Sequence, residues 1–262
     1  VLIALRAGVM EARGVFSMVS RETALVANNI LLSVAALVVF IGTIWPLVGQ
    51  MLLGRDLSVG EPFFNAAFTP FMVALALILP VGAMLAWKRG SIGRSLRGLV
   101  PVLVLAVALG LLAFAMQTGT SALGPIGLAL GAWVVFGALA DLWARTGRDG
   151  IGARLSRLTR LPRADWGKAT AHLGLGVTLF AVAAMHSWKV EDIRVVQEGD
   201  SFPLGAYEVR LDKVEEVQGP NYTSLMGTMT VTKGGALVAV LNPEKRNYPV
   251  AGMPTTAAAI DF

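Results

Sequence analysis

Cysteine is absent from the 262 residues of this sequence. The absence excludes disulfides, thiol catalysis and thiolate metal sites, so any redox chemistry would need a bound group or a partner. Charge is also scarce: 15% of the residues are charged, whereas 55% are hydrophobic. That is too little charge to coat a water-soluble domain of this length, and we expect membrane lipid to solvate part of the chain.

Several catalytic signatures are missing as well. The sequence contains no GxxxxGK(S/T) phosphate loop, no HExxH, no GxSxG, and no GxGxxG placed after an expected strand. These absences exclude the common ATPase, zinc protease and serine hydrolase classes. The net charge of +5 does not indicate a nucleic-acid partner, because the basic residues occupy short loops between apolar runs rather than one element.

Five apolar runs dominate the sequence. A bilayer core about 30 Å thick requires about 20 mainly apolar residues per helix, and backbone groups in lipid must pair within their own segment. The runs therefore predict a membrane α-helical bundle over residues 23–186, with Pro46 kinking the first helix near its far end. The five predicted spans are residues 30–53, 68–87, 99–116, 123–143 and 166–185.

The basic residues predict the orientation, since Lys and Arg collect in cytoplasmic loops. The second and third spans are separated by Lys88, Arg89, Arg94 and Arg97. The fourth and fifth are separated by Arg145, Arg148, Arg154, Arg157, Arg160 and Arg163, and Lys168 lies at the entry to the fifth. The alternate connections hold only Arg55 as a cation. We therefore expect residues 1–22 to be cytoplasmic and residues 187–262 to lie outside the cytoplasm, in a multi-pass membrane protein.

The composition changes after the fifth span and predicts a small β-rich domain over residues 187–262. Expected strands are 194–196, 207–211, 228–232 and 237–241, separated by turn residues at 199–200, 219–221 and 233–235. A domain this short buries little core on its own, so we expect it to rest on the bundle or on a partner.

His172 is the most informative single residue. An imidazole within an apolar helix needs a reason to be there, and its free nitrogen is a natural axial ligand for haem iron. The small residues Ala171, Gly174 and Gly176 leave room for a flat macrocycle or, equally, for a neighbouring helix. From the residues alone, a ligand or proton-relay role and a hydrogen-bonded structural role are both open.

Two other polar features have simpler interpretations. His186 lies where the fifth span meets the outer surface, where amphipathic side chains are common. Asn28 and Asn29 open the first predicted span, where they either cap the helix or contact a polar ligand or helix.

Six separated segments carry a resemblance to a known family. With their order along the chain, they resemble the CcmF/CycK family of cytochrome c-type biogenesis proteins, of which NrfE is a close relative. The segments are Ser20-Arg21-Glu22 with Asn28-Asn29, Gly42-Thr43-Ile44-Trp45-Pro46, Ser58-Val59-Gly60-Glu61-Pro62-Phe63-Phe64-Asn65, Ala171-His172-Leu173-Gly174, Pro243-Glu244-Lys245-Arg246 and Met253-Pro254-Thr255-Thr256.

The resemblance implies a membrane subunit of the haem lyase, which attaches haem to apocytochrome c by thioether bonds. It implies that the membrane is the bacterial inner (cytoplasmic) membrane and that residues 187–262 are periplasmic. It also implies three partners: the haem chaperone CcmE, CcmH/CcmI-type subunits and apocytochrome c. The family holds a haem b between two membrane histidines, and His172 matches the second of these by its surrounding motif. The resemblance therefore implies that His172 is an axial ligand of haem iron, while the catalytic residues stay unknown.

The departures from the family limit this interpretation. The tryptophan-rich haem-handling segment, the other membrane histidine and two outer histidines have no counterpart here. We therefore expect a C-terminal fragment of a longer protein, inactive as a lyase by itself. Two alternatives are a membrane transporter subunit, for which Asp141 is the main acid available, and a non-catalytic scaffold that presents the periplasmic domain.

Overall fold

The computed structural model describes residues 17–54, 59–119, 122–250 and 253–261. It divides the chain into two compact units, of which the first ends at Trp188 and the second begins at Lys189. Residues 1–16 of the predicted N-terminal segment lie outside the described residues, as do residues 55–58, of which Ser58 begins one of the family-like segments.

Five helices of the first unit are long and apolar enough to cross a membrane, which confirms the predicted helical bundle. The second, third and fourth of these helices along the chain form a buried cluster. Each predicted span falls largely within one of the five helices, and the protein is a multi-pass membrane protein. The helices are α2 (Arg21–Leu53), α3 (Glu61–Met84), α4 (Ile92–Met116), α5 (Leu123–Ala144) and α7 (Arg163–Trp188).

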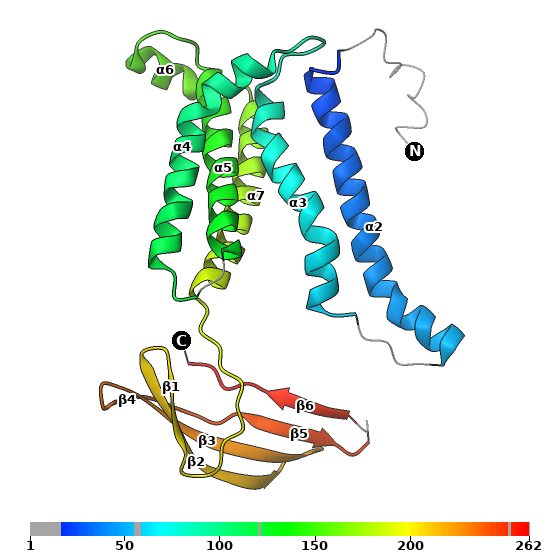
Figure 1. Ribbon diagram of the computed structural model, residues 1–262, viewed down its shortest axis with the longest axis vertical. Helices are drawn as coiled ribbons and strands as arrows, with labels where there is room; N and C mark the ends of the chain where they lie inside the picture. The colour runs from blue at the N-terminus through cyan, green and yellow to red at the C-terminus, as the bar shows by residue number, and fades with distance from the viewer. Residues whose placement is uncertain (1–16, 55–58, 120–121, 251–252, 262) are drawn as a thin grey trace. The chain divides into compact units, whose positions relative to one another are not determined.

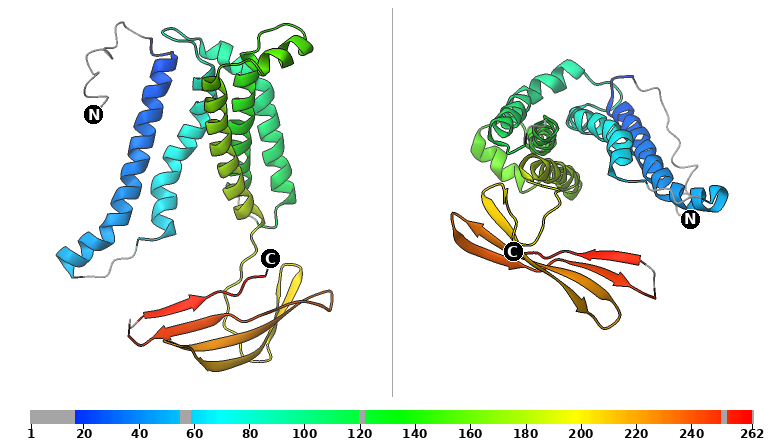
Figure 2. Two further views of the ribbon diagram at one scale, coloured as in Figure 1. Left: turned by 180° about the vertical axis from the view of Figure 1, so that it is seen from behind. Right: turned by 60° about the horizontal axis from the view of Figure 1, so that its bottom comes forward.

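The first helix begins earlier than its apolar run. The Ser20 side chain caps α2 by accepting a hydrogen bond from the Thr23 backbone N–H at 3.2 Å, and the helix then starts at Arg21. Asn28 and Asn29 therefore lie inside α2, and their interpretation as a cap is wrong. Figures 1 and 2 show the last part of α2 bending away from the rest of the helix, which contains Pro46 as predicted for a kink.

Helix α5 occupies the centre of the first unit. It packs against α3, α4 and α7, and Figure 1 shows it between α4 and α7. Its contact with α7 is close because glycines face backbone: a Cβ on Gly131 would lie 2.7 Å from the Phe180 nitrogen. Small residues that let two backbones approach are typical of packing between membrane helices.

The basic connections gather at one end of the helices. There the segment before α2 pairs with the α3–α4 loop, through Ser17 N–H to the Lys88 carbonyl at 2.9 Å and Gly90 N–H to the Val19 carbonyl at 2.7 Å. The Arg21 guanidinium lies 5.1 Å from the ring centroid of Trp87. Figures 1 and 2 show a short helix, α6 (Ile151–Leu158), at the same end.

The second unit is an antiparallel sheet of six strands, which confirms the predicted β-rich class. Its order is β1-β2-β3-β5-β6, with β4 also paired to β3. The strands are β1 (Ser201–Leu204), β2 (Tyr207–Gln218), β3 (Thr223–Lys233), β4 (Ala236–Leu241), β5 (Glu244–Tyr248) and β6 (Met253–Ala257).

The strand predicted at 194–196 is wrong, because this stretch forms no ladder and its Val195 is fully exposed at 98%. The turn predicted at 233–235 is confirmed: Gly234 and Gly235 have φ of 57° and 83°, as a tight β3–β4 hairpin requires. Within the described part of this unit, Val209, Leu211 and Ser224 are the buried residues. Because this core is so small, a partner that covers part of the sheet stays a prediction.

Candidate functional site

His172 lies in the third turn of α7, at the edge of the face that packs on α5. Ala169, Gly176 and Ala183 are buried at a spacing of seven residues and define that face. His172 is three residues from Ala169 and four from Gly176, so it borders the packed face and is half-buried.

The hydrogen bonding of the His172 imidazole bears on the two roles that the sequence leaves open. Among the residues that the structure describes, neither of its ring nitrogens makes a hydrogen bond, so the hydrogen-bonded structural role finds no support. An unpaired polar ring within an apolar membrane helix is costly. Coordination of a metal ion or hydrogen bonding to a bound group would remove that cost.

A group of charged side chains lies one turn away from His172. The ammonium of Lys168 forms an ion pair with the buried carboxylate of Asp141 on α5. The Arg145 guanidinium bridges Asp141 at 3.3 Å and Asp165 of α7 at 2.9 Å. These ion pairs link the end of α5 to the start of α7. They therefore fix the axial position and the rotation of α7, the helix that carries His172.

This charged group was not predicted. Lys168 counted only as an orientation signal and Asp141 only as an isolated acid, because the two are 27 residues apart (168 − 141). The one local signal is the spacing of Asp141 and Arg145, which is that of a helical ion pair.

The small residues around His172 have separate roles. A Cβ on Gly176 would lie 2.9 Å from the Val135 nitrogen, so this glycine serves the contact with α5. A Cβ on Gly174 would meet no atom within 4 Å. However, two residues correspond to about 200° of helix rotation, so this open space is on the opposite side from His172. The small residues were predicted to leave room for a macrocycle or for a neighbouring helix, and Gly176 leaves room for the neighbouring helix.

His186 lies too far from His172 to share a ligand with it. The two are 14 residues apart on α7 (186 − 172), which is about 21 Å along a helix. They are the two histidines of the sequence, and the described residues hold no group of three or more His, Cys, Asp or Glu side chains placed for a metal ion. The residues present therefore fit one axial position of a haem iron, and a second histidine would have to come from elsewhere.

The structure brings several family-like segments together. A Cβ on Gly42 of α2 would lie 2.7 Å from ring atoms of Phe63 and Phe64 of α3, so the second and third segments are in contact. In the second unit, Arg246 of β5 is paired with Thr255 of β6, so the last two segments are neighbouring strands.

Comparisons with known proteins agree with this architecture. Residues 187–262 match the family model described as the CcmF C-terminal beta-sandwich. Over 260 residues the chain is 55% identical to the cytochrome c-type biogenesis protein ccl1 of Rhodobacter capsulatus, covering 99% of this chain and 39% of that protein. It is 42% identical to the cytochrome c-type biogenesis protein CycK of Rhizobium meliloti over 99% of the chain.

A solved structure supports the fold independently. The chain is similar to the cytochrome c haem lyase CcmF, with a TM-score of 0.59, 24% identity, and coverage of 94% of this chain and 38% of that one. The chain thus spans about two fifths of the length of the relatives it matches.

Proposed function

This chain belongs to the CcmF/CycK family of cytochrome c-type biogenesis proteins, and on that premise we propose that it is the part of a cytochrome c haem lyase that holds a membrane haem through His172. The observation that carries the proposal is the half-buried imidazole of His172, which makes no hydrogen bond among the described residues. It lies in a part of α7, residues 171–185, that is apolar apart from Thr178.

The residues of this chain would serve the haem in three ways. The neutral imidazole of His172 would be one axial ligand, and the ion pairs of Asp141 with Lys168 and Arg145 would fix the position of its helix. The apolar surroundings would limit access of water. When bound, a haem b supplies a one-electron redox centre, whose potential depends on axial ligation and burial.

We place the β-sheet unit on the periplasmic side. The basic connections lie at one end of the helices, and α7 begins at that end, so the chain after Trp188 continues from the opposite end of the helices. By the positive-inside rule, the basic end is cytoplasmic and the residues after α7 are periplasmic. This side is where the proposed partners CcmE, CcmH/CcmI-type subunits and apocytochrome c would meet the sheet.

The transporter alternative is less well supported. Asp141 is the acid that such a mechanism would use, but it is paired with Arg145 and Lys168 and lies close to the end of α5. A carboxylate held in this way stabilises the joint between α5 and α7.

The test is a reduced-minus-oxidised visible spectrum of the purified full-length protein, measured beside cytochrome c maturation in the same cells. His172→Ala is expected to abolish the b-type haem band and maturation. His186→Ala, on the same helix but at its far end, is the matched control and is expected to keep both.

A rescue experiment separates loss of the haem ligand from loss of the fold. Imidazole added to the His172→Ala protein should restore part of the haem band, whereas a misfolded protein would not respond. An unchanged spectrum of His172→Ala would refute the proposal. Partner capture that survives together with maturation in this variant would instead favour the scaffold role.

A further inference from the structure

The short helix α6 connects the ends of two membrane spans. It comprises Ile151–Leu158, between α5 and α7, and none of its residues is buried. Because α5 ends at Ala144 and α7 begins at Arg163, the chain between them cannot move far from the membrane surface. Figures 1 and 2 show α6 at the end of the bundle that carries the basic connections.

This helix is amphipathic. Ile151, Leu155 and Leu158 are separated by four and three residues, so they share one face, while Arg154 and Arg157 lie to one side of it. Ile151 is 71% exposed and Leu155 is 52% exposed. An exposed apolar face flanked by arginines is typical of a helix that lies in the plane of a membrane interface.

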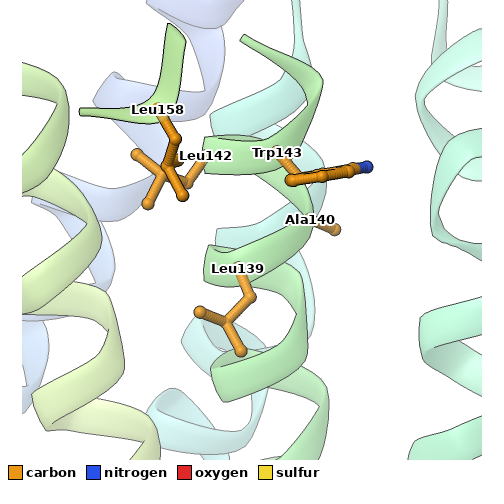
Figure 3. A pocket seen from close by; sticks show the side chains of 5 residues that line it. All are labelled: Leu139, Ala140, Leu142, Trp143 and Leu158. Carbon is orange, nitrogen blue, oxygen red and sulfur yellow. The ribbon is translucent and has the colours of Figure 1, made fainter. Parts of the chain in front are cut away.

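An apolar hollow lies between α6 and the end of α5. It is an open hollow with a volume of about 370 Å³, and Figure 3 shows the side chains that line it, of which Leu158 comes from α6 and the others from α5. The full lining is Leu139, Ala140, Leu142, Trp143 and Leu158. The volume falls within the range of about 300–1,000 Å³ that ligand pockets occupy.

One arginine is fixed at the rim of this hollow. The Arg154 guanidinium stacks on the ring of Trp143, 4.0 Å from its centroid. It also donates hydrogen bonds to the Thr146 hydroxyl at 3.0 Å and to the Trp143 carbonyl at 2.8 Å. A cation held in place beside an apolar hollow matches a ligand with an anionic head and an apolar tail.

Further positive charge around α6 is left unneutralised. Asp149 is the single acid from 145 to 163, and it pairs with Arg157. Across the described part of the chain, the exposed side chains of Arg148, Arg160 and Arg163 find neither an ion pair nor a hydrogen bond. The positive charges around α6 are sufficient to explain the orientation of the protein in the membrane. They do not explain why Arg154 is held in place or why an apolar hollow lies beside it.

We propose that α6 and the hollow beside it bind one anionic phospholipid, with an acyl chain in the hollow and the phosphate against Arg154 and the unpaired arginines Arg148 and Arg160. The lipid surface is the occupant because the site lies between two membrane spans and joins an apolar cavity to positive charge. A nucleic acid or a free phosphate would not use the hollow. The proposal does not depend on His172 or on haem.

The experiment places the full-length protein in nanodiscs of phosphatidylcholine with a minor fraction of phosphatidylglycerol, and counts the retained phosphatidylglycerol by native mass spectrometry. The variant Arg148→Gln/Arg160→Gln removes two unpaired charges, and Leu139→Trp fills the hollow without a charge change. The matched control Arg94→Gln/Arg97→Gln removes the same charge from exposed positions at the same end.

Arg148→Gln/Arg160→Gln is expected to lower phosphatidylglycerol retention by roughly thirtyfold, the effect of losing two cations worth about 1 kcal/mol each at a membrane surface. Leu139→Trp should lower the retention as well, because the hollow is then filled, while the control keeps it. Equal losses in the two arginine pairs would overturn the proposal in favour of diffuse attraction. Retention that is insensitive to Leu139→Trp, or that millimolar inorganic phosphate competes away, would also overturn it, since the hollow would then play no part.

Discussion

Helices α2 and α5 differ in burial in the direction opposite to their hydropathy. Over the most apolar window of 18 residues in each helix, α2 has the higher mean hydropathy, yet only 11% of its window is buried, against 50% for α5. Lipid solvates an apolar side chain as well as a protein interior does, so hydropathy alone does not draw membrane helices together. Between these two helices, hydropathy therefore does not report burial within the unit, whereas small residues of α5 such as Gly131 mark its contact with another helix.

The glycines of the two helices show the same difference. On α5, a Cβ on Gly131 would meet backbone atoms of Phe180, and the reciprocal Gly176 of α7 would meet the backbone of Val135. On α2, a Cβ on Gly42 would meet only the rings of Phe63 and Phe64. Backbone atoms cannot rotate away, whereas rings can, so the contact between α5 and α7 tolerates less change.

The largest expected effect comes from Gly176→Ala. The new methyl group would push α5 and α7 apart, and we expect a loss of about 1–3 kcal/mol of stability, as for other overpacked interiors. The same displacement would move His172, so the haem band should weaken. Thermal unfolding in detergent, followed with the visible spectrum, measures both effects.

Gly174→Ala is the matched control, because it makes the same change two residues away where a Cβ meets nothing within 4 Å. This variant should be unchanged or slightly stabilised, since alanine favours a helix more than glycine does by about 0.5–1 kcal/mol. Equal stability of the two variants would mean that the α5–α7 seam is not backbone-limited.

A smaller effect is expected from Trp133→Phe on α5. The indole N–H of Trp133 donates to the Leu77 carbonyl of α3 at 3.2 Å, and the ring is 93% buried (100 − 7). Loss of this hydrogen bond should cost about 0.6 kcal/mol, the average for side-chain hydrogen bonds between membrane helices, plus the effect of a smaller ring. Trp45→Phe on α2, where the side chain is half exposed, should leave the midpoint of unfolding unchanged.

Gly42→Ala should have the least effect within the helices. The rings of Phe63 and Phe64 can turn aside, and the gain in helix propensity of about 0.5–1 kcal/mol offsets part of the cost. We expect a net change near zero in the unfolding midpoint. A loss as large as that of Gly176→Ala would show that α2 is fixed as rigidly as α5, and would remove the distinction between them.

The sequence was sufficient for features that depend on local pattern. Apolar length located five spans, and the glycine pair at 234–235 located a hairpin. It was not sufficient for α6, because an eight-residue helix between arginines has the composition of a loop. It also missed β5, in which Glu244, Lys245 and Arg246 favour no strand and pairing with β3 and β6 supplies the order.

The candidate site likewise combines a feature that the sequence predicts with features that it does not. His172 is identifiable from the sequence because a polar ring is conspicuous in an apolar run. The ion pair of Asp141 with Lys168 joins residues of two helices, so it depends on how α5 and α7 pack and not on any local spacing. Gly174 faces open space, whereas Gly176 faces α5. The sequence does not predict this difference, because it depends on where the neighbouring helix lies.

The weakest expected effect tests the unit outside the membrane, where electrostatic interactions replace the packing of small residues. Asp212 lies at a register shift between β2 and β3 and accepts hydrogen bonds from the Thr230 hydroxyl and the Arg210 guanidinium. These two groups, the hydroxyl first, hold the pKa of Asp212 below its usual value. The contribution to stability is therefore present above the unfolded-state pKa, about 3.9 for aspartate, and is lost as pH falls through the lower folded-state value.

Asp212→Asn should remove this acid dependence from the pairing of β2 with β3. Hydrogen exchange of their amides in the full-length protein, followed from pH 6 to about pH 2.5, measures it across the range in which aspartate protonates. Glu216→Gln, an exposed carboxylate on β2, is the control and should keep the wild-type profile. Identical profiles for Asp212→Asn and wild type would mean that the sheet is held by its ladder alone, since an exposed carboxylate in water gains little from its partners.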